Sequence, residues 1–304
     1  MRQKNPLMLL MVGSMLSLGV FTLSSCDDDD DDIVLPPIGG YNSSDEVGAA
    51  NLVGYWGFEG NGNESKTGTA PTSQVGQVYG PGGIKGQAVT LTNGYLYYAS
   101  ALAPLVSNQP FTVSAWIQVK NTKDSPTPPT NKPYIYFQSA IPGQLWGNFN
   151  GLVQTDHFSH LSDTLVVKSV YKDSSGGTQD NLNNYGTWGT EVKANKKAGT
   201  NQWVHIVTTY NPAGGTGNES IFRIYADSAM VSNINFENRH GGAFKYTPGE
   251  TIIGGWYNNI PGKQVSTDDW TIPFNGKIDE IRVWNKLLPE SDIVALYQLG
   301  KQGR

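Results

Sequence analysis

The 304-residue sequence contains one cysteine, Cys26, so no disulfide can form within the chain. Charged residues make up only 15% of it, against roughly 25% in an average soluble protein. They form no dense basic stripe of the kind that contacts phosphates, so we expect no nucleic-acid partner. Instead the chain is rich in Gly, Tyr and Trp, with 36, 15 and 8 residues. This composition is poor for long helices and typical of a turn-rich β protein.

Common catalytic signatures are also missing. The sequence has neither the Gly-x-Ser-x-Gly elbow of α/β hydrolases nor the His-Glu-x-x-His motif of zinc peptidases. Two histidines, His157 and His160, share a polar stretch, but on a strand they would face opposite sides. We therefore expect a polar loop there rather than a metal site. His205, between apolar strand residues, is expected to be structural rather than catalytic.

The first 25 residues have the features of a secretory signal peptide. Arg2 and Lys4 precede an apolar run from Leu7 to Leu23, and small residues follow before Cys26. The order Leu-Ser-Ser-Cys resembles the lipobox of bacterial lipoproteins. That resemblance implies that the Cys26 thiol is acylated, for example with palmitate, and that Cys26 becomes the first residue of the mature chain. The alternative is an ordinary signal peptide with a chance cysteine.

Six aspartates, Asp27 to Asp32, follow the cysteine and would keep the chain extended by mutual repulsion. Such a block resembles the acidic export signal of surface lipoproteins in some Gram-negative bacteria. The resemblance implies a lipid anchor in the outer membrane with the protein facing the exterior; the alternative is a solvated spacer. We predict a signal peptide at 1–25, a Pro- and Gly-containing tether at 26–48 and one domain at 49–304.

The rest of the chain alternates short apolar runs with Gly, Asn and Pro clusters, which predicts β-strands joined by turns. Along Phe111–Val119 the odd-numbered residues form a core face, and Ser114 and Trp116 lie on a face that we expect to be partly wet. Only Glu290–Leu299 has helical spacing. The pattern predicts an all-β, two-sheet antiparallel jelly-roll sandwich with one short C-terminal helix. The strands are expected at 53–59, 88–91, 95–98, 111–120, 134–138, 151–154, 164–171, 203–210, 221–226, 251–254 and 274–284.

Four segments in order match a known family: Gly54–Glu59 (GYWGFE), Phe111–Trp116 (FTVSAW), Trp203–Tyr210 (WVHIVTTY) and Phe274–Trp284 (FNGKIDEIRVW). Together they resemble the concanavalin A-like, laminin-G-like jelly-roll domain over about 51–299. The stretch from 121 to about 200 is longer than the usual connection in that family. We predict that it is an insertion that builds extra loops or strands.

Some glucanases with this fold carry Glu-x-Asp-x-Glu on one strand, which places the carboxylates on one face. The closest pattern here is Asp279-Glu280, whose adjacent side chains should face opposite sides of a strand. We therefore expect a structural role, such as pairing of Glu280 with Arg282 or with an ion, and a protein that is not an enzyme.

Calcium is the cofactor that the resemblance implies, because laminin-G-like and pentraxin-like relatives often bind Ca²⁺ through oxygen ligands. The candidate ligands are Glu59, Asn61 and Asn63 on a Gly-rich turn, with Asp279 from the closing strand. A solvated Asn-Gly turn is the alternative.

Sugar binding requires flat aromatic rings beside amide or charged side chains. Trp146, Trp188 and Trp256 lie in Gly- and Asn-rich segments outside the four family motifs, with Tyr185, Tyr257 and Asn258 next to them. Exposed rings of this kind favour a ligand. Alternatively, the loops bury these rings against one another.

These observations predict a surface-anchored, non-catalytic carbohydrate-binding lipoprotein that assists polysaccharide capture. Its partner would be a glycan. The alternatives are an adhesion module that binds a cell-surface protein and a diverged glycoside hydrolase.

Overall fold

A computed structural model describes residues 35–103, 105, 108–127, 130, 132–182, 202–217, 219–232, 237–240 and 244–304. The predicted signal peptide, Cys26 and the six aspartates lie outside the described residues, as do Tyr185 and Trp188. One compact unit comprises Pro36–Arg304. Among the described residues, no helix has the length and apolar character needed to cross a bilayer.

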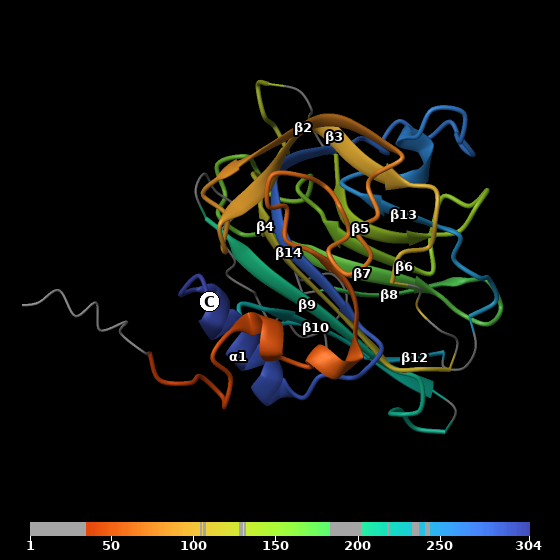
Figure 1. Cartoon of the computed structure of the whole chain (residues 1–304). Helices are drawn as coiled ribbons and strands as arrows, with labels where there is room; N and C mark the ends of the chain where they lie inside the picture. Colours follow the sequence, from red (N-terminus) through yellow and green to blue (C-terminus); the bar gives the residue numbers. More distant parts are fainter. Residues whose placement is uncertain are drawn as a thin grey trace, which may run out of the picture. The chain divides into compact units, whose positions relative to one another are not determined.

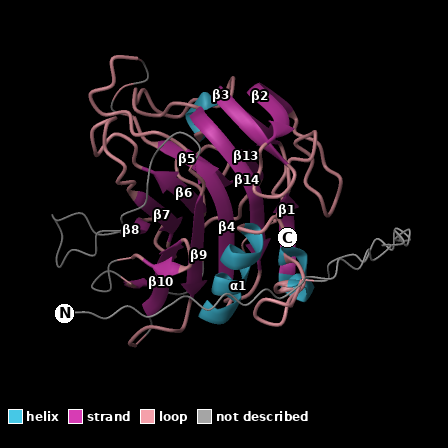
Figure 2. Cartoon of the chain, turned by 90° about the vertical axis from the view of Figure 1, so that its left-hand side faces the viewer, coloured by secondary structure: helices cyan, strands magenta, loops and turns pink. Residues whose placement is uncertain are grey.

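The described strands pair antiparallel and form a curved sandwich of two layers (Figures 1 and 2). The first layer runs in the order β11-β10-β9-β4-β14-β3, with β1 on β14, β12 on β10 and β2 on β3. Its strands are β1 Leu52–Trp56, β2 Ser73–Pro81, β3 Gln87–Tyr98, β4 Phe111–Gln118, β9 Val204–Asn211, β10 Glu219–Ala226, β11 Ala229–Met230, β12 Asn238–His240 and β14 Phe274–Trp284.

The second layer runs in the order β13-β5-β6-β7-β8. Its strands are β13 Glu250–Ile253, β5 Tyr134–Ala140, β6 Phe149–Val153, β7 Val167–Lys172 and β8 Thr178–Leu182. The long strand β3 joins the layers, because its first half pairs with β14 and its end pairs with β13. The predicted all-β jelly roll is confirmed. Four of the five strands of this layer lie between residues 121 and 200, so that segment forms much of the second layer.

Aromatic rings fill the space between the layers. Phe111 of β4 stacks on Tyr210 of β9 with ring centroids 5.0 Å apart, and Tyr171 of β7 contacts both Tyr210 and Phe222 at 5.0 and 4.9 Å. All four side chains are at most 1% exposed. Each comes from the apolar face of its strand, so burial of these large rings provides the main driving force for closing the sandwich.

The outer face of β4 is also buried, which differs from the partly wet face predicted from the sequence. Thr112, Ser114 and Trp116 on this face are at most 3% exposed. The cover is the helix α1, Glu290–Gly300, whose Tyr297 stacks on Trp116 with centroids 5.7 Å apart (Figure 2). Trp116 in turn stacks on His205 at 4.7 Å. Polar residues on this face thus belong to a second, smaller interior.

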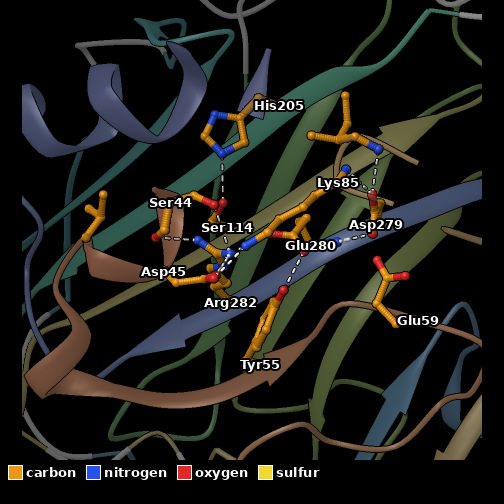
Figure 3. Close-up of polar contacts among 12 residues, drawn as sticks. Ser44, Asp45, Tyr55, Glu59, Lys85, Ser114, His205, Asp279, Glu280 and Arg282 are labelled. Atoms are coloured by element: carbon orange, nitrogen blue, oxygen red, sulfur yellow. Dashed lines mark hydrogen bonds and ion pairs between the residues drawn. The ribbon is translucent and has the colours of Figure 1, made fainter. Parts of the chain in front are cut away.

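A β-bulge in β14 changes which residues face this interior. The register with β4 shifts between Asp279 and Arg282, and Glu280 there has a left-handed backbone with φ of 51°. As a result Asp279, Glu280 and Arg282 lie on the same side of the strand (Figure 3). The prediction that Asp279 and Glu280 face opposite sides was wrong, because strict alternation fails at the bulge. The predicted pairing of Glu280 with Arg282 is present at 2.5 Å.

A buried polar cluster around Arg282 holds the N-terminal strap, residues 36–48, on the sheet (Figure 3). The Arg282 guanidinium donates to the Ser44 carbonyl at 2.5 Å and to the Asp45 carboxylate at 2.7 Å. The Tyr55 hydroxyl donates to Glu280 at 2.6 Å. Val47 of the strap is 1% exposed, so the predicted tether is too long: its second half packs on the domain.

Three short 3-10 helices, at Ser44–Glu46, Ala49–Asn51 and Tyr257–Asn259, complete the described elements.

We predict that Arg282→Met destabilises the domain by about 3–5 kcal/mol, because it leaves the Glu280 carboxylate buried without its cation. The free energy of unfolding in urea measures this loss. Lys286→Met makes the same chemical change at an exposed position and should alter stability by less than about 0.5 kcal/mol. Equal stability of the two variants would show that the cluster does not hold the strap.

A second prediction concerns acid. Burial lowers the pKa of His205 from 6.5 to about 3, so the folded protein keeps a neutral imidazole, hydrogen-bonded to Ser114 at 2.8 Å. The stability that depends on this neutral form is complete above pH 6.5 and is lost as the pH falls from 6.5 toward 3, by at most about 1.4 kcal/mol per pH unit.

His205→Gln keeps a hydrogen-bonding group near Ser114 but removes the titration. Between pH 7 and pH 4 the wild-type protein should therefore lose more unfolding free energy than this variant. Parallel pH profiles for the two proteins would contradict the assignment.

Candidate functional site

Two of the predicted sugar-binding tryptophans, Trp146 and Trp256, lie in one cluster with Trp270. Trp256 is fully buried and meets Trp146 and Trp270 edge-on, with centroids 5.2 and 4.9 Å away. Its ring has no face left for a sugar, so its prediction as a binding residue was wrong. The alternative, that loops bury these rings against one another, describes it correctly. Trp146 and Trp270 are half-buried and keep part of their rings at the surface.

The residues after Trp256 shape the same loop. Tyr257 is 3% exposed, and its hydroxyl accepts a hydrogen bond from the Gly143 N–H at 2.9 Å. The Asn258 amide donates to the Ser266 hydroxyl at 2.7 Å and accepts from the Val265 N–H at 2.9 Å. These polar atoms therefore form their hydrogen bonds within the domain. Both residues therefore support the loop, and Tyr257 presents no free ring surface.

Three of the four predicted calcium ligands, Glu59, Asn61 and Asp279, accept hydrogen bonds from backbone N–H groups. The Glu59 carboxylate accepts the Gln87 N–H, and the Asn61 side-chain oxygen accepts the N–H of Asn63 at 2.8 Å. Asp279 is engaged separately, by the Ile84 N–H at 2.6 Å and by the Glu280 N–H at 2.8 Å. The described residues contain no group of three or more His, Cys, Asp and Glu side chains that could hold a metal. Calcium binding stays a prediction from the sequence.

The polar interior beneath α1 is too closed for a ligand. Its cavity, between Ser114, His205 and Arg282, measures about 10 Å³, which is about the space of one water molecule. Ser114 and His205 are 2% and 1% exposed. Burial and the neighbouring Glu280 carboxylate raise the pKa of Asp279 to about 8. No substrate can reach these groups in the structure, so their hydrogen bonds serve packing.

An open groove of about 670 Å³ lies at the other end of the central strands. One wall comes from paired positions on three neighbouring strands: Thr90 of β3, Lys277 of β14 and Gln118 of β4. Paired residues of adjacent strands share a face, so these three side chains point to one side of the sheet. Tyr134 and Val119 provide apolar surface. The volume is that of a small-molecule or oligosaccharide site.

The second wall is the segment that follows β4, tied to the loop between β6 and β7. The Thr122 N–H donates to the Thr155 carbonyl at 2.6 Å, and the His160 N–H donates to the Lys123 carbonyl at 2.8 Å. The Asn121 amide donates to the carbonyls of Ser162 and Thr164, each at 2.9 Å. These bonds fix the backbone of both loops, so the wall is formed before any ligand arrives.

Two side chains of this wall have unused polar atoms. The Asn121 Oδ1 and the His160 Nδ1 are buried and have no hydrogen-bond partner among the described residues. An unsatisfied buried polar atom costs about 1–3 kcal/mol. Two unpaired atoms of the same kind, His205 Nδ1 and Arg282 Nε, lie beneath α1, so these atoms alone do not mark a ligand site.

This groove was not predicted from the sequence. His160 was expected in a polar loop, and Asn121, Gln118 and Lys277 were given no role. The sequence did hold a signal, because Gln118 is the polar last residue of β4 and Lys277 is the polar fourth residue of β14. Their meeting depends on strand pairing between segments about 160 residues apart, which alternation within one strand does not reveal.

Comparison with solved structures shows the same fold in several proteins. The receptor-binding domain of botulinum neurotoxin type G has a TM-score of 0.52 at 10% identity, and the binding domain of Paraclostridial mosquitocidal protein 1 has 0.50 at 16%. Each match covers 82% of this chain and about half of the toxin domain, 51% and 52%. Domain 4 of an extracellular GH43 arabinanase from Geobacillus stearothermophilus, solved with arabinotriose, has a TM-score of 0.48 at 18% identity, covering 82% and 98%.

At the level of sequence, no curated protein matches the chain significantly. A laminin G-type family model, described as the concanavalin A-like lectin/glucanases superfamily, matches residues 90–294, which is more than half of the chain. This range contains strands of both layers and most of the residues that line the groove. The chain belongs to the concanavalin A-like lectin/glucanases superfamily.

Proposed function

We propose that this protein is a non-catalytic carbohydrate-binding lipoprotein whose domain captures a glycan at the cell surface. The observation that carries the proposal is the open groove of about 670 Å³, whose lining residues Gln118, Asn121 and His160 bear amide and imidazole groups. Sugars present many hydroxyl groups, which suit amide, imidazole and hydroxyl partners. The half-buried Trp146 and Trp270 form a second surface that could stack on a sugar face.

The distribution of carboxylates supports a binding role. Hydrolysis of a glycosidic bond generally needs two carboxyl groups that flank it. No Asp or Glu is among the described residues that line the groove. The adjacent acids Asp279 and Glu280 lie under the strap and α1, at most 5% exposed and tied to other groups.

The edge strand β2 favours the alternative, a protein-binding module. β2 pairs only with β3 among the described strands, and its Val75 and Val78 are 46% and 66% exposed. An unpaired edge with exposed valines can add a strand from another protein. The surface is small, and the groove offers more specific contacts, so glycan binding is the function we put forward.

Binding should be measured with the chain carrying Cys26→Ser, which can be purified without lipid. We predict binding to at least one polysaccharide on a glycan array and about a tenfold loss of affinity in His160→Ala and in Gln118→Ala, the effect of losing one hydrogen bond to the ligand. Neither side chain forms a hydrogen bond with a described residue, so folding should be preserved, which circular dichroism would check.

Asn285→Ala is the matched control, because this exposed amide lies outside the groove. A loss confined to Trp146→Ala would place the site on the tryptophan pair instead. Absence of binding to every polysaccharide, with binding to a surface protein that depends on Val78, would support the protein-binding alternative.

The lipid anchor yields a separate prediction. Cells fed with alkyne-tagged palmitate should label the wild-type chain, and the label should fractionate with the outer membrane. Cys26→Ala removes the only thiol of the chain and should abolish labelling. Labelling that persists in this variant, or a wild-type chain found unlabelled in the cytosol, would contradict the anchor.

A further inference from the structure

The charge of the groove is positive. Lys120 and Lys277 line it, with the imidazole of His160, and no carboxylate is present among its described lining residues. Neither ammonium group has an ion pair or hydrogen bond with a described residue. Elsewhere on the domain, Lys132, Lys168 and Lys263 pair with carboxylates at 3.2, 2.8 and 2.6 Å.

An unpaired lysine on a protein surface is ordinary by itself. What distinguishes this place is that two of them border one groove, whose lining also includes the amide of Gln118 and the imidazole of His160. Lys277 is half-buried, and its ammonium lies beside Gly82 in the turn between β2 and β3. A half-buried ammonium is screened less by salt than an exposed one. The attraction between this ammonium and an anionic group on a ligand would therefore be stronger here than on the open surface.

We propose that the groove selects an acidic saccharide, one that carries uronate carboxylates or sulfate esters. The ammonium groups of Lys120 and Lys277 bind the anionic substituents, and the side chains of Gln118 and His160 bind neighbouring hydroxyls. Hydrogen bonds to a charged group are roughly twice as strong as those between neutral groups, so the anion sets the preference. This inference rests on the proposed glycan-binding function and names its ligand class.

The number of charges favours a saccharide over a nucleic acid. Two ammonium groups in one groove match one or two anionic substituents along a sugar chain. A nucleic acid presents a phosphate on every nucleotide and needs a continuous basic stripe. From Ile33 onward the sequence has nearly equal numbers of basic and acidic residues, so it lacks the net positive charge that favours binding to nucleic acid.

Two pairs of probes test the inference, each with one backbone in a charged and a neutral form. Polygalacturonate is compared with its methyl ester, and dextran sulfate with dextran, in isothermal titration at 150 mM salt. We expect the charged member of one pair to bind about tenfold more tightly than its neutral form, the gain from one charge-assisted hydrogen bond. The pair that shows the difference tells carboxylate from sulfate.

A double variant, Lys120→Gln with Lys277→Gln, should lose this preference. Lys286→Gln with Lys301→Gln is the matched control, because it also removes two positive charges, from exposed positions outside the groove. The control should bind the charged probe as the wild type does, and raising the salt concentration should weaken the wild type more than the groove variant.

The possible outcomes test this inference separately from the proposed glycan-binding function. Equal loss in both double variants would mean that overall charge attracts the probes, and would overturn the inference. Binding of only neutral polysaccharides, with loss in His160→Ala, would overturn the inference while the glycan-binding function stands. Absence of binding to all four probes and to every polysaccharide of the array would overturn both the inference and the glycan-binding function.

Discussion

A buried cation controls the organisation of this domain. Arg282 lies on the central strand β14, 2% exposed, and draws toward it the Glu280 carboxylate, the Asp45 carboxylate and the Ser44 carbonyl. A buried guanidinium is costly unless it is paired and hydrogen-bonded, and here both terminal nitrogens have partners while the Nε has none among the described residues. Because two of its partners come from the strap, the segment before β1 must return to the sheet. The β-bulge at Glu280 supplies the third partner from the same strand.

This constraint divides β14 into two regions with different chemistry. At its Arg282 end, the strap and α1 cover the sheet and turn a polar face into an interior, where Ser114, His205 and Tyr55 have their hydrogen bonds inside the protein. At its Lys277 end none of the described helices lies over the strand, and loops form the second wall of the groove. Polar groups there remain available. The same strand thus supports a closed structural cluster and an open groove.

The architecture could be predicted from the sequence because short apolar strands and family motifs recur along the chain. β14 and α1 were predicted within one residue of their observed bounds, β14 because a family motif spans it and α1 because its apolar residues have helical spacing. Strand β2 was missed, because SQVGQVYGP has no alternation and is largely exposed; it exists through its pairing with β3. Short β8 was missed for a similar reason.

The candidate site was harder to predict, because it depends on burial and on contacts between residues far apart in the sequence. Trp256 and Trp146 look alike in sequence, yet one ring is the floor of a tryptophan cluster and the other is its rim. The side of β14 on which the Glu280 side chain lies depends on the left-handed backbone of Glu280 itself, which no local sequence preference predicts. The groove depended on contacts between Asn121 and the loop at Ser162, 41 residues away.

The two ends of the compact unit are clasped together. Arg304 donates to the carbonyls of Asn42 and Pro36, and its own carbonyl accepts the Ser44 N–H. Tension applied to the chain at Pro36 would pass through the strap to Arg282 and so to β14, which is flanked by β3 and β4. Because β14 lies in the middle of the sheet, that tension would be shared by the hydrogen bonds to both neighbouring strands.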